Sequence, residues 1–137
     1  MTTHTRTISV LCVDDDPHVL SFVTDSFNAA GFEVQTAVDG SHALQKIATA
    51  EPPYDVLVVD GRMPNLDGWR FVMHVRSGGF DGKIIIFSAH LDEYQLQRYR
   101  ELMVDRVIQK PLASGELIAA VRELTLESSA TAMPGTM

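Results

Sequence analysis

The chain of 137 residues has one cysteine, no long apolar run and few basic residues, and each shortage excludes a class of protein. The single cysteine, Cys12, excludes an intramolecular disulfide and is compatible with a reducing compartment. No apolar run approaches the ~20 residues of a transmembrane helix. Residues 1–6 lack the apolar core of a secretory signal. We therefore expect a cytoplasmic protein without a membrane partner.

Acidic residues outnumber basic ones by 18 to 11, which gives a formal net charge of −7. This charge disfavours non-specific binding to nucleic acid, but it does not disfavour basic protein partners. The hydrophobic share of 45% and the charged share of 21% are close to ordinary globular usage. Length and composition together predict one compact domain with a single core.

Apolar, β-branched runs alternate with amphipathic segments along the chain. The runs predict five strands, at residues 7–13, 32–37, 55–59, 83–87 and 106–109. Apolar spacings of three and four predict helices at about 17–30, 41–50, 67–76, 92–103 and 114–126, with Asp16 and Asp67 as N-caps and Met103 facing inward. We expect a domain over residues 6–126 and a flexible tail over residues 127–137.

Strands that alternate with helices predict a parallel sheet that is covered by helices on both faces. Because crossovers are right-handed, few topologies remain, and the flavodoxin-like strand order 2-1-3-4-5 is expected for five strands. The predicted fold class is therefore α/β, a doubly wound (βα)5 parallel sheet. In such sheets ligands bind at the carboxyl ends of the strands, so the residues just past each strand indicate the site.

Polar residues follow four of the five predicted strands. Asp14 and Asp15 follow the first strand, Asp60 the third, Ser88 the fourth and Lys110 the fifth. Clustered carboxylates repel one another, and Mg²⁺, which takes oxygen ligands and pairs with phosphate, relieves that repulsion. A carboxylate is also a competent nucleophile toward phosphorus, and an ammonium and a hydroxyl can stabilise phosphoryl oxygens. The set is therefore suited to phosphoryl transfer.

These residues and their neighbours resemble the receiver domain of response regulators in two-component signalling, and in size the chain resembles the single-domain regulators of chemotaxis. The resemblance covers roughly residues 7–126 and rests on Asp14-Asp15, Asp60 with Met63-Pro64 and Asp67-Gly68, Ser88-Ala89, and Lys110-Pro111. It implies that Asp60 accepts a phosphoryl group from a sensor histidine kinase or a phosphotransfer protein in a Mg²⁺-dependent reaction.

The resemblance also implies the metal ligands. Asp15 and Asp60 would bind Mg²⁺, Asp14 would hold a metal-bound water, and Arg62 would offer its backbone carbonyl. The phosphorylated state would shift a two-state equilibrium that an unidentified downstream protein reads, and homodimerisation on phosphorylation is left open. The chain would thus be a self-phosphorylating switch with slow autodephosphorylation rather than a turnover enzyme, and it would not itself bind nucleic acid.

By the same resemblance, Ser88 would be the switch hydroxyl and Lys110 the phosphoryl-binding lysine, followed by a Lys110–Pro111 bond that is usually cis in the family. Arg62 and His90 are expected at the rim of the phosphoryl group, where they would set the lifetime of the phosphorylated state. Trp69 is either a partner contact or simple packing.

Two positions depart from the family pattern. Val107 stands three residues before the lysine, where the family commonly has an aromatic residue, so the switch is either carried differently or muted. Residues 102–105 lack the Gly-Ala that often precedes the fifth strand, so the join to that strand is expected to differ.

Two alternatives remain open at this point. A receiver-like module could dock partners without phosphorylation, and Val107 is the feature that supports this alternative. An aspartate-nucleophile phosphatase of the haloacid dehalogenase type would use Asp14 in an Asp14-x-Asp16 motif. The chain, however, lacks the acidic pair that such a phosphatase would need after Lys110, and it shows no cap domain.

Overall fold

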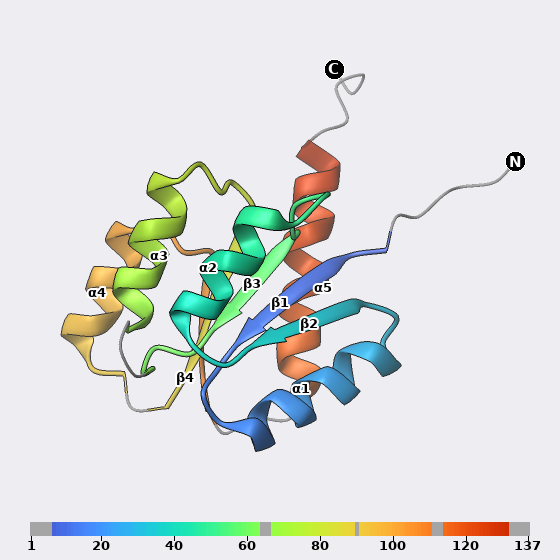
Figure 1. Cartoon of the computed structure of the whole chain (residues 1–137), viewed down its shortest axis with the longest axis horizontal. Coiled ribbons are helices and arrows are strands. Elements are labelled where there is room, and N and C mark those ends of the chain that lie inside the picture. The colour runs from blue at the N-terminus through green and yellow to red at the C-terminus, as the bar shows by residue number, and fades with distance from the viewer. Residues whose placement is uncertain (1–6, 64–66, 90, 111–113, 132–137) are drawn as a thin grey trace, which may run out of the picture.

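The computed structural model describes residues 7–63, 67–89, 91–110 and 114–131, in which strands and helices alternate (Figure 1). The strands are β1 (Ser9–Val13), β2 (Glu33–Ala37), β3 (Val56–Val59), β4 (Lys83–Ser88) and β5 (Arg106–Gln109). The helices are α1 (Pro17–Ala29), α2 (Gly40–Thr49), α3 (Gly68–Ser77), α4 (Glu93–Glu101) and α5 (Ser114–Thr131). The strands pair in parallel in the order β2-β1-β3-β4-β5, which confirms the predicted topology.

The sheet separates two apolar layers, because successive side chains of a strand point to opposite faces. In β1, Val10 and Cys12 belong to the layer covered by α1 and α5, and Leu11 and Val13 belong to the layer covered by α2, α3 and α4 (Figure 1). The central strands are buried on both faces, as expected for a parallel sheet. Burial raises the pKa of the Cys12 thiol, which therefore behaves as a small core residue, as predicted.

Aspartate side chains cap the N-termini of four helices. The Asp16 carboxylate accepts a hydrogen bond of 2.9 Å from the amide of His18, and Asp67 accepts one of 2.9 Å from the amide of Arg70. Both predicted caps are confirmed, and Asp39 and Asp92 cap α2 and α4 in the same way.

Two predictions about helix ends are wrong. Helix α4 ends at Glu101, and Met103 is 77% exposed with a φ of 61°, so its side chain does not face inward. Helix α5 continues to Thr131 instead of ending near residue 126. The physical reason is that no glycine or proline follows Gly115 until Pro134, so the sequence has no residue that would end the helix earlier.

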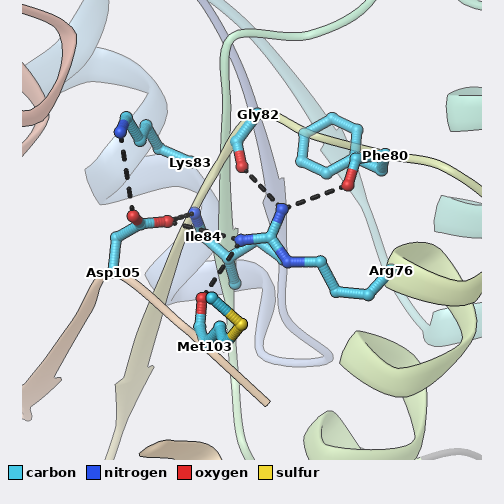
Figure 2. Close-up of polar contacts among 7 residues, drawn as sticks. All are labelled: Arg76, Phe80, Gly82, Lys83, Ile84, Met103 and Asp105. Atoms are coloured by element: carbon cyan, nitrogen blue, oxygen red, sulfur yellow. Dashed lines mark hydrogen bonds and ion pairs between the residues drawn. The ribbon is translucent and has the colours of Figure 1, made fainter. Parts of the chain in front are cut away.

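Arg76 and Asp105 join the loops at the amino-terminal edge of the sheet (Figure 2). The Arg76 guanidinium donates to four acceptors, which are the carbonyls of Phe80 (3.1 Å), Gly82 (2.9 Å) and Met103 (3.3 Å) and the Asp105 carboxylate (3.4 Å). The same Asp105 oxygen accepts a 2.8 Å hydrogen bond from the amide of Ile84 in β4. This network fixes the starts of β4 and β5 at the sheet edge opposite the predicted site. None of the helices within the described ranges is long and apolar enough to cross a membrane.

Candidate functional site

The backbone of the sheet brings Asp14 and Asp60 together. Val13 and Val59 are register partners at the ends of β1 and β3, and each is followed by one of the two aspartates. The amide of Asp60 donates a 2.9 Å hydrogen bond to the Val13 carbonyl, which continues the ladder one residue past β3. The carboxyl ends of the strands therefore form one acidic edge, as the sequence predicts.

Three carboxylates share this edge. Asp14, Asp15 and Asp60 each offer an oxygen, and these atoms all lie within 4.8 Å of one another. Asp14 and Asp60 are 2% and 6% exposed, whereas Asp15 is exposed. An all-oxygen set with one open side fits a hard divalent cation that keeps some of its waters. The cluster could therefore hold a metal ion.

Lys110 supplies the positive charge of the site. Its ammonium lies 2.7 Å from Asp14 Oδ2 and 3.7 Å from Asp60 Oδ1. The amide of Lys110 donates a 3.0 Å hydrogen bond to the Ser88 carbonyl, so the end of β4 positions the lysine. One ammonium faces three carboxylates, and the site keeps a net negative charge that a divalent cation would offset.

Burial raises the pKa of Asp60 to about 6, and the neighbouring Asp14 and Asp15 carboxylates act in the same direction. The Lys110 ammonium and the hydrogen bond from the Arg62 amide act in the opposite direction but do not cancel the effect of burial. Added positive charge at this edge would therefore favour the ionised form of Asp60.

The oxygens of Asp14 and Asp60 differ in their hydrogen bonds. Asp14 Oδ1 accepts from the amide of Asp16 at 2.9 Å, and its Oδ2 accepts from Lys110, so both oxygens are engaged. Asp60 Oδ1 accepts from the amide of Arg62 at 3.2 Å. Within the described part of the chain, Asp60 Oδ2 accepts no hydrogen bond. Asp60 thus has an oxygen that is not committed to another group.

Ser88, fully buried at the end of β4, completes the edge. Its hydroxyl donates a 3.2 Å hydrogen bond to the Ala89 carbonyl. The Arg62 side chain is exposed, and the Arg62 amide donates to Asp60. The Arg62 carbonyl, expected from the sequence as a metal ligand, stays a prediction. His90 and Pro111, and with them the predicted cis bond, lie outside the described residues.

A pocket of about 530 Å³ adjoins the acidic edge between the loop after β3 and helices α3 and α4. It is lined by Asp15, Gly61, Arg62, Met63, Asp67, Trp69, Gln95, Arg98 and Tyr99. Trp69 is half-buried and its ring centroid lies 3.7 Å from the Arg98 guanidinium carbon, so Trp69 joins α3 to α4.

The family model for the response regulator receiver domain matches residues 10–122. The chain belongs to this family. It is 36% identical over 123 residues to the transcriptional regulatory protein PrrA of Mycobacterium leprae, covering 90% of the chain and 52% of PrrA. It is likewise 36% identical over 115 residues to the response regulator MprA of Mycobacterium avium, covering 84% of the chain and 50% of MprA. The chain spans about half the length of the curated relatives it matches.

The structural comparison agrees with the sequence comparison. The chemotaxis protein CheY4 of Vibrio cholerae superposes with a TM-score of 0.81 at 27% identity, over 87% of this chain and 99% of that one. A CheY-like receiver domain from Methanospirillum hungatei gives a TM-score of 0.87 over 92% of this chain and 99% of that one, and its 20% identity shows the fold alone. The predicted function class, a two-component receiver domain, is confirmed, and the phosphatase alternative is not supported.

Sequence reasoning missed the closeness of Tyr99 to the site. A Cβ on Gly61 would lie 3.0 Å from the Tyr99 hydroxyl oxygen and 3.0 Å from Ser88 Oγ, so both oxygens face the loop after β3. The sequence carries one signal of this contact, since Gly61 and Gly68 leave room at both ends of the loop. Nothing in the linear pattern says which side chain occupies that room.

Proposed function

We propose that Asp60 is the phospho-acceptor of this receiver domain. The observation that carries this assignment is the uncommitted Oδ2 of Asp60, beside an Asp14 whose two oxygens are both engaged. In the transfer, Asp60 Oδ2 attacks the phosphorus of a phosphohistidine on a kinase or phosphotransfer protein. The phosphorus–oxygen bond forms, the phosphorus–nitrogen bond breaks, and the imidazole leaves as the neutral ring after taking up a proton.

The oxygens of Asp14, Asp15 and Asp60 would hold Mg²⁺, because the three groups form a compact all-oxygen set with one exposed member. When bound, the cation supplies positive charge to the transferring phosphoryl oxygens and keeps Asp60 ionised. The Arg62 carbonyl and a water held by Asp14 stay proposed as further ligands.

Lys110 and Ser88 would contact the transferred phosphoryl group. Lys110 lies 3.7 Å from Asp60 Oδ1, so a small movement of its flexible side chain brings the ammonium to an oxygen on Asp60. Ser88 would turn its hydroxyl from the Ala89 carbonyl to the phosphoryl group. Arg62 and His90 are proposed to rim the group and to slow its loss to water.

The consequence of phosphorylation is proposed to be a shift between two conformations that changes the binding of a downstream protein. The acyl phosphate then hydrolyses slowly, so the chain acts as a switch and not as a turnover enzyme. We place this receiver domain at residues 6–126, in the cytoplasm, with a histidine kinase or phosphotransfer protein upstream. Contact with nucleic acid is not assigned to this chain, and homodimerisation is an outcome to be measured.

The test is intact mass after incubation with Mg²⁺ and acetyl phosphate. The wild type and Asp25→Asn, a change at an exposed aspartate of α1, are expected to gain one phosphate that is labile at high pH. Asp60→Asn is expected to gain none, and chelation of Mg²⁺ should abolish the adduct in all proteins. An adduct that persists in Asp60→Asn but is lost in Asp14→Asn would contradict the assignment. No adduct in the wild type, with Mg²⁺ binding confirmed, would favour a docking module.

A further inference from the structure

Tyr99 is the one buried residue of α4, with 3% of its surface exposed. Its ring packs in the apolar layer formed by α2, α3 and α4, to which Val107 and Trp69 also belong. Its hydroxyl extends from that layer toward the carboxyl end of β3. Tyr99 is therefore a side chain through which α4 comes close to the loop between Asp60 and α3, which we call the acceptor loop.

Two glycines, Gly61 in the acceptor loop and Gly68 at the start of α3, make room for this hydroxyl. A Cβ on Gly68 would lie 2.7 Å from the Tyr99 oxygen and 2.8 Å from the Asp60 carbonyl oxygen. A Cβ on Gly61 would lie 3.0 Å from the Tyr99 oxygen and 3.0 Å from Ser88 Oγ. A larger residue at position 68 would overlap the tyrosine, and one at position 61 would press against it. The hydroxyl thus lies between the loop that carries Asp60 and the strand end that carries Ser88.

The Tyr99 hydroxyl makes no hydrogen bond to another residue within the described ranges, although the side chain is almost fully buried. It lines the pocket beside the acidic edge. Burial, together with the Asp67 and Asp60 carboxylates, raises the pKa of Tyr99 to about 12, so the hydroxyl stays protonated and can donate. Because the hydroxyl faces this pocket and no other residue of the described ranges holds it there, it is free to donate to a new partner when the site changes.

We propose that Tyr99 is a positioning residue of the switch: in the phosphorylated state its hydroxyl donates a hydrogen bond to Ser88 Oγ. Ser88 Oγ in turn donates to the phosphoryl group on Asp60. A serine hydroxyl can donate one hydrogen bond and accept two, so it can hold both contacts at once. The two hydrogen bonds, from Tyr99 to Ser88 and from Ser88 to the phosphoryl group, would link the phosphorylation of Asp60 to the position of α4. This inference rests on the proposed function.

The position of Tyr99 also bears on the missing aromatic residue at Val107, which left open whether the switch is carried differently or muted. The Val107 side chain has no polar atom and no ring, and Val107 pairs with Ile86 in the ladder between β4 and β5. Tyr99 belongs to the same apolar layer and brings an aromatic ring and a hydroxyl to Ser88 from a different element. The switch would therefore be carried by α4 itself rather than by β5.

Trp69 gives a direct readout, because it is the only tryptophan of the chain and stacks on Arg98, the residue beside Tyr99. The wild type, Tyr99→Phe and Tyr94→Phe would be incubated with Mg²⁺ and acetyl phosphate. The change in Trp69 emission would then be divided by the phosphorylated fraction from intact mass. Tyr94 is the matched control, since it lies in the same helix and is 67% exposed.

The expected result is that all three proteins form the adduct, that wild type and Tyr94→Phe change their emission, and that Tyr99→Phe loses the change. An equal change per adduct in Tyr99→Phe would overturn the inference. So would an adduct without any emission change in the wild type, or loss of the adduct in Tyr99→Phe, which would give the tyrosine a role in transfer. Absence of the adduct from the wild type would contradict the proposed function itself, and the inference with it.

Discussion

The ammonium of Lys110 lies 2.7 Å from Oδ2 of Asp14, a residue 96 positions earlier in the chain. Their strands, β5 and β1, are not neighbours, because β3 and β4 lie between them in the sheet. The pair crosses the carboxyl edge above Asp60, and its side chains are only 17% and 3% exposed. It holds the acidic edge together electrostatically and places a cation beside the proposed acceptor.

Replacing Lys110 with alanine should destabilise the metal-free protein. The change leaves buried carboxylates without their cation, and we expect the free energy of unfolding in a chelator to fall by about 2–4 kcal/mol. Added Mg²⁺ should restore part of the loss. Urea unfolding with and without Mg²⁺ measures both effects. The control is Lys83→Ala, which removes a partly exposed ammonium 3.9 Å from Asp105 and should cost less than about 1 kcal/mol. Equal losses in the two variants would contradict the account.

The raised pKa of Asp60 predicts how stability depends on pH. Folding raises this pKa from its ordinary value of 3.8 to about 6, so the folded state binds more protons between these values. The wild type should therefore lose stability, relative to Asp60→Asn, as pH rises through this window. The loss should be about 1–3 kcal/mol without metal. Unfolding at pH 4 and pH 7.5 in a chelator measures it. A constant difference between wild type and Asp60→Asn would show that burial does not disfavour the charged form.

Met103 adopts a left-handed backbone conformation at φ 61°, which glycine tolerates better than methionine. The side chain is 77% exposed, so its removal sacrifices little packing. Met103→Gly should stabilise the protein by about 0.5–1 kcal/mol, because it removes the strain of a non-glycine residue in this region. Thermal unfolding beside Met73→Gly, which places glycine inside α3 and should destabilise, tests the sign. A destabilised Met103→Gly would be inconsistent with the strain argument.

The network around Arg76 should require an arginine at this position. A lysine at this position cannot reach the carbonyls of Phe80, Gly82 and Met103 together with Asp105. Arg76→Lys should lower the free energy of unfolding by about 1–3 kcal/mol, because several acceptors, most of them part-buried, lose their donors. Phosphorylation by acetyl phosphate should persist, since the network lies at the starts of β4 and β5, at the sheet edge opposite Asp60. Arg70→Lys, an exposed change in the same helix, should leave stability unchanged. Equal effects of the two substitutions would refute a special role for Arg76.

The sequence is informative where a local rule determines the structure. Asp14, Asp60 and Lys110 could be placed together because each follows a buried run, and parallel strands end at one edge. Asp16 and Asp67 could be identified as caps from their neighbours alone. These inferences need only the spacing of apolar residues along the chain and the geometry of a parallel sheet.

Other features depend on contacts that no local pattern encodes. The left-handed turn at Met103 arises where α4 must leave its axis to start β5, next to the Arg76 network. The approach of Tyr99 to Gly61 depends on how α4 packs across the end of the sheet. Each of these features is set by tertiary packing between elements, and periodicity along one element does not report it.

The measurement that tests the central claim most directly is the chemical identification of the phosphorylated residue. Borohydride reduces an aspartyl phosphate to homoserine, which marks the acceptor covalently before digestion and peptide sequencing by mass spectrometry. After phosphorylation of the wild type with Mg²⁺ and acetyl phosphate, homoserine is predicted at position 60 and aspartate is predicted to persist at positions 14 and 15. Homoserine at position 14 or 15, with an unmodified Asp60, would contradict the account.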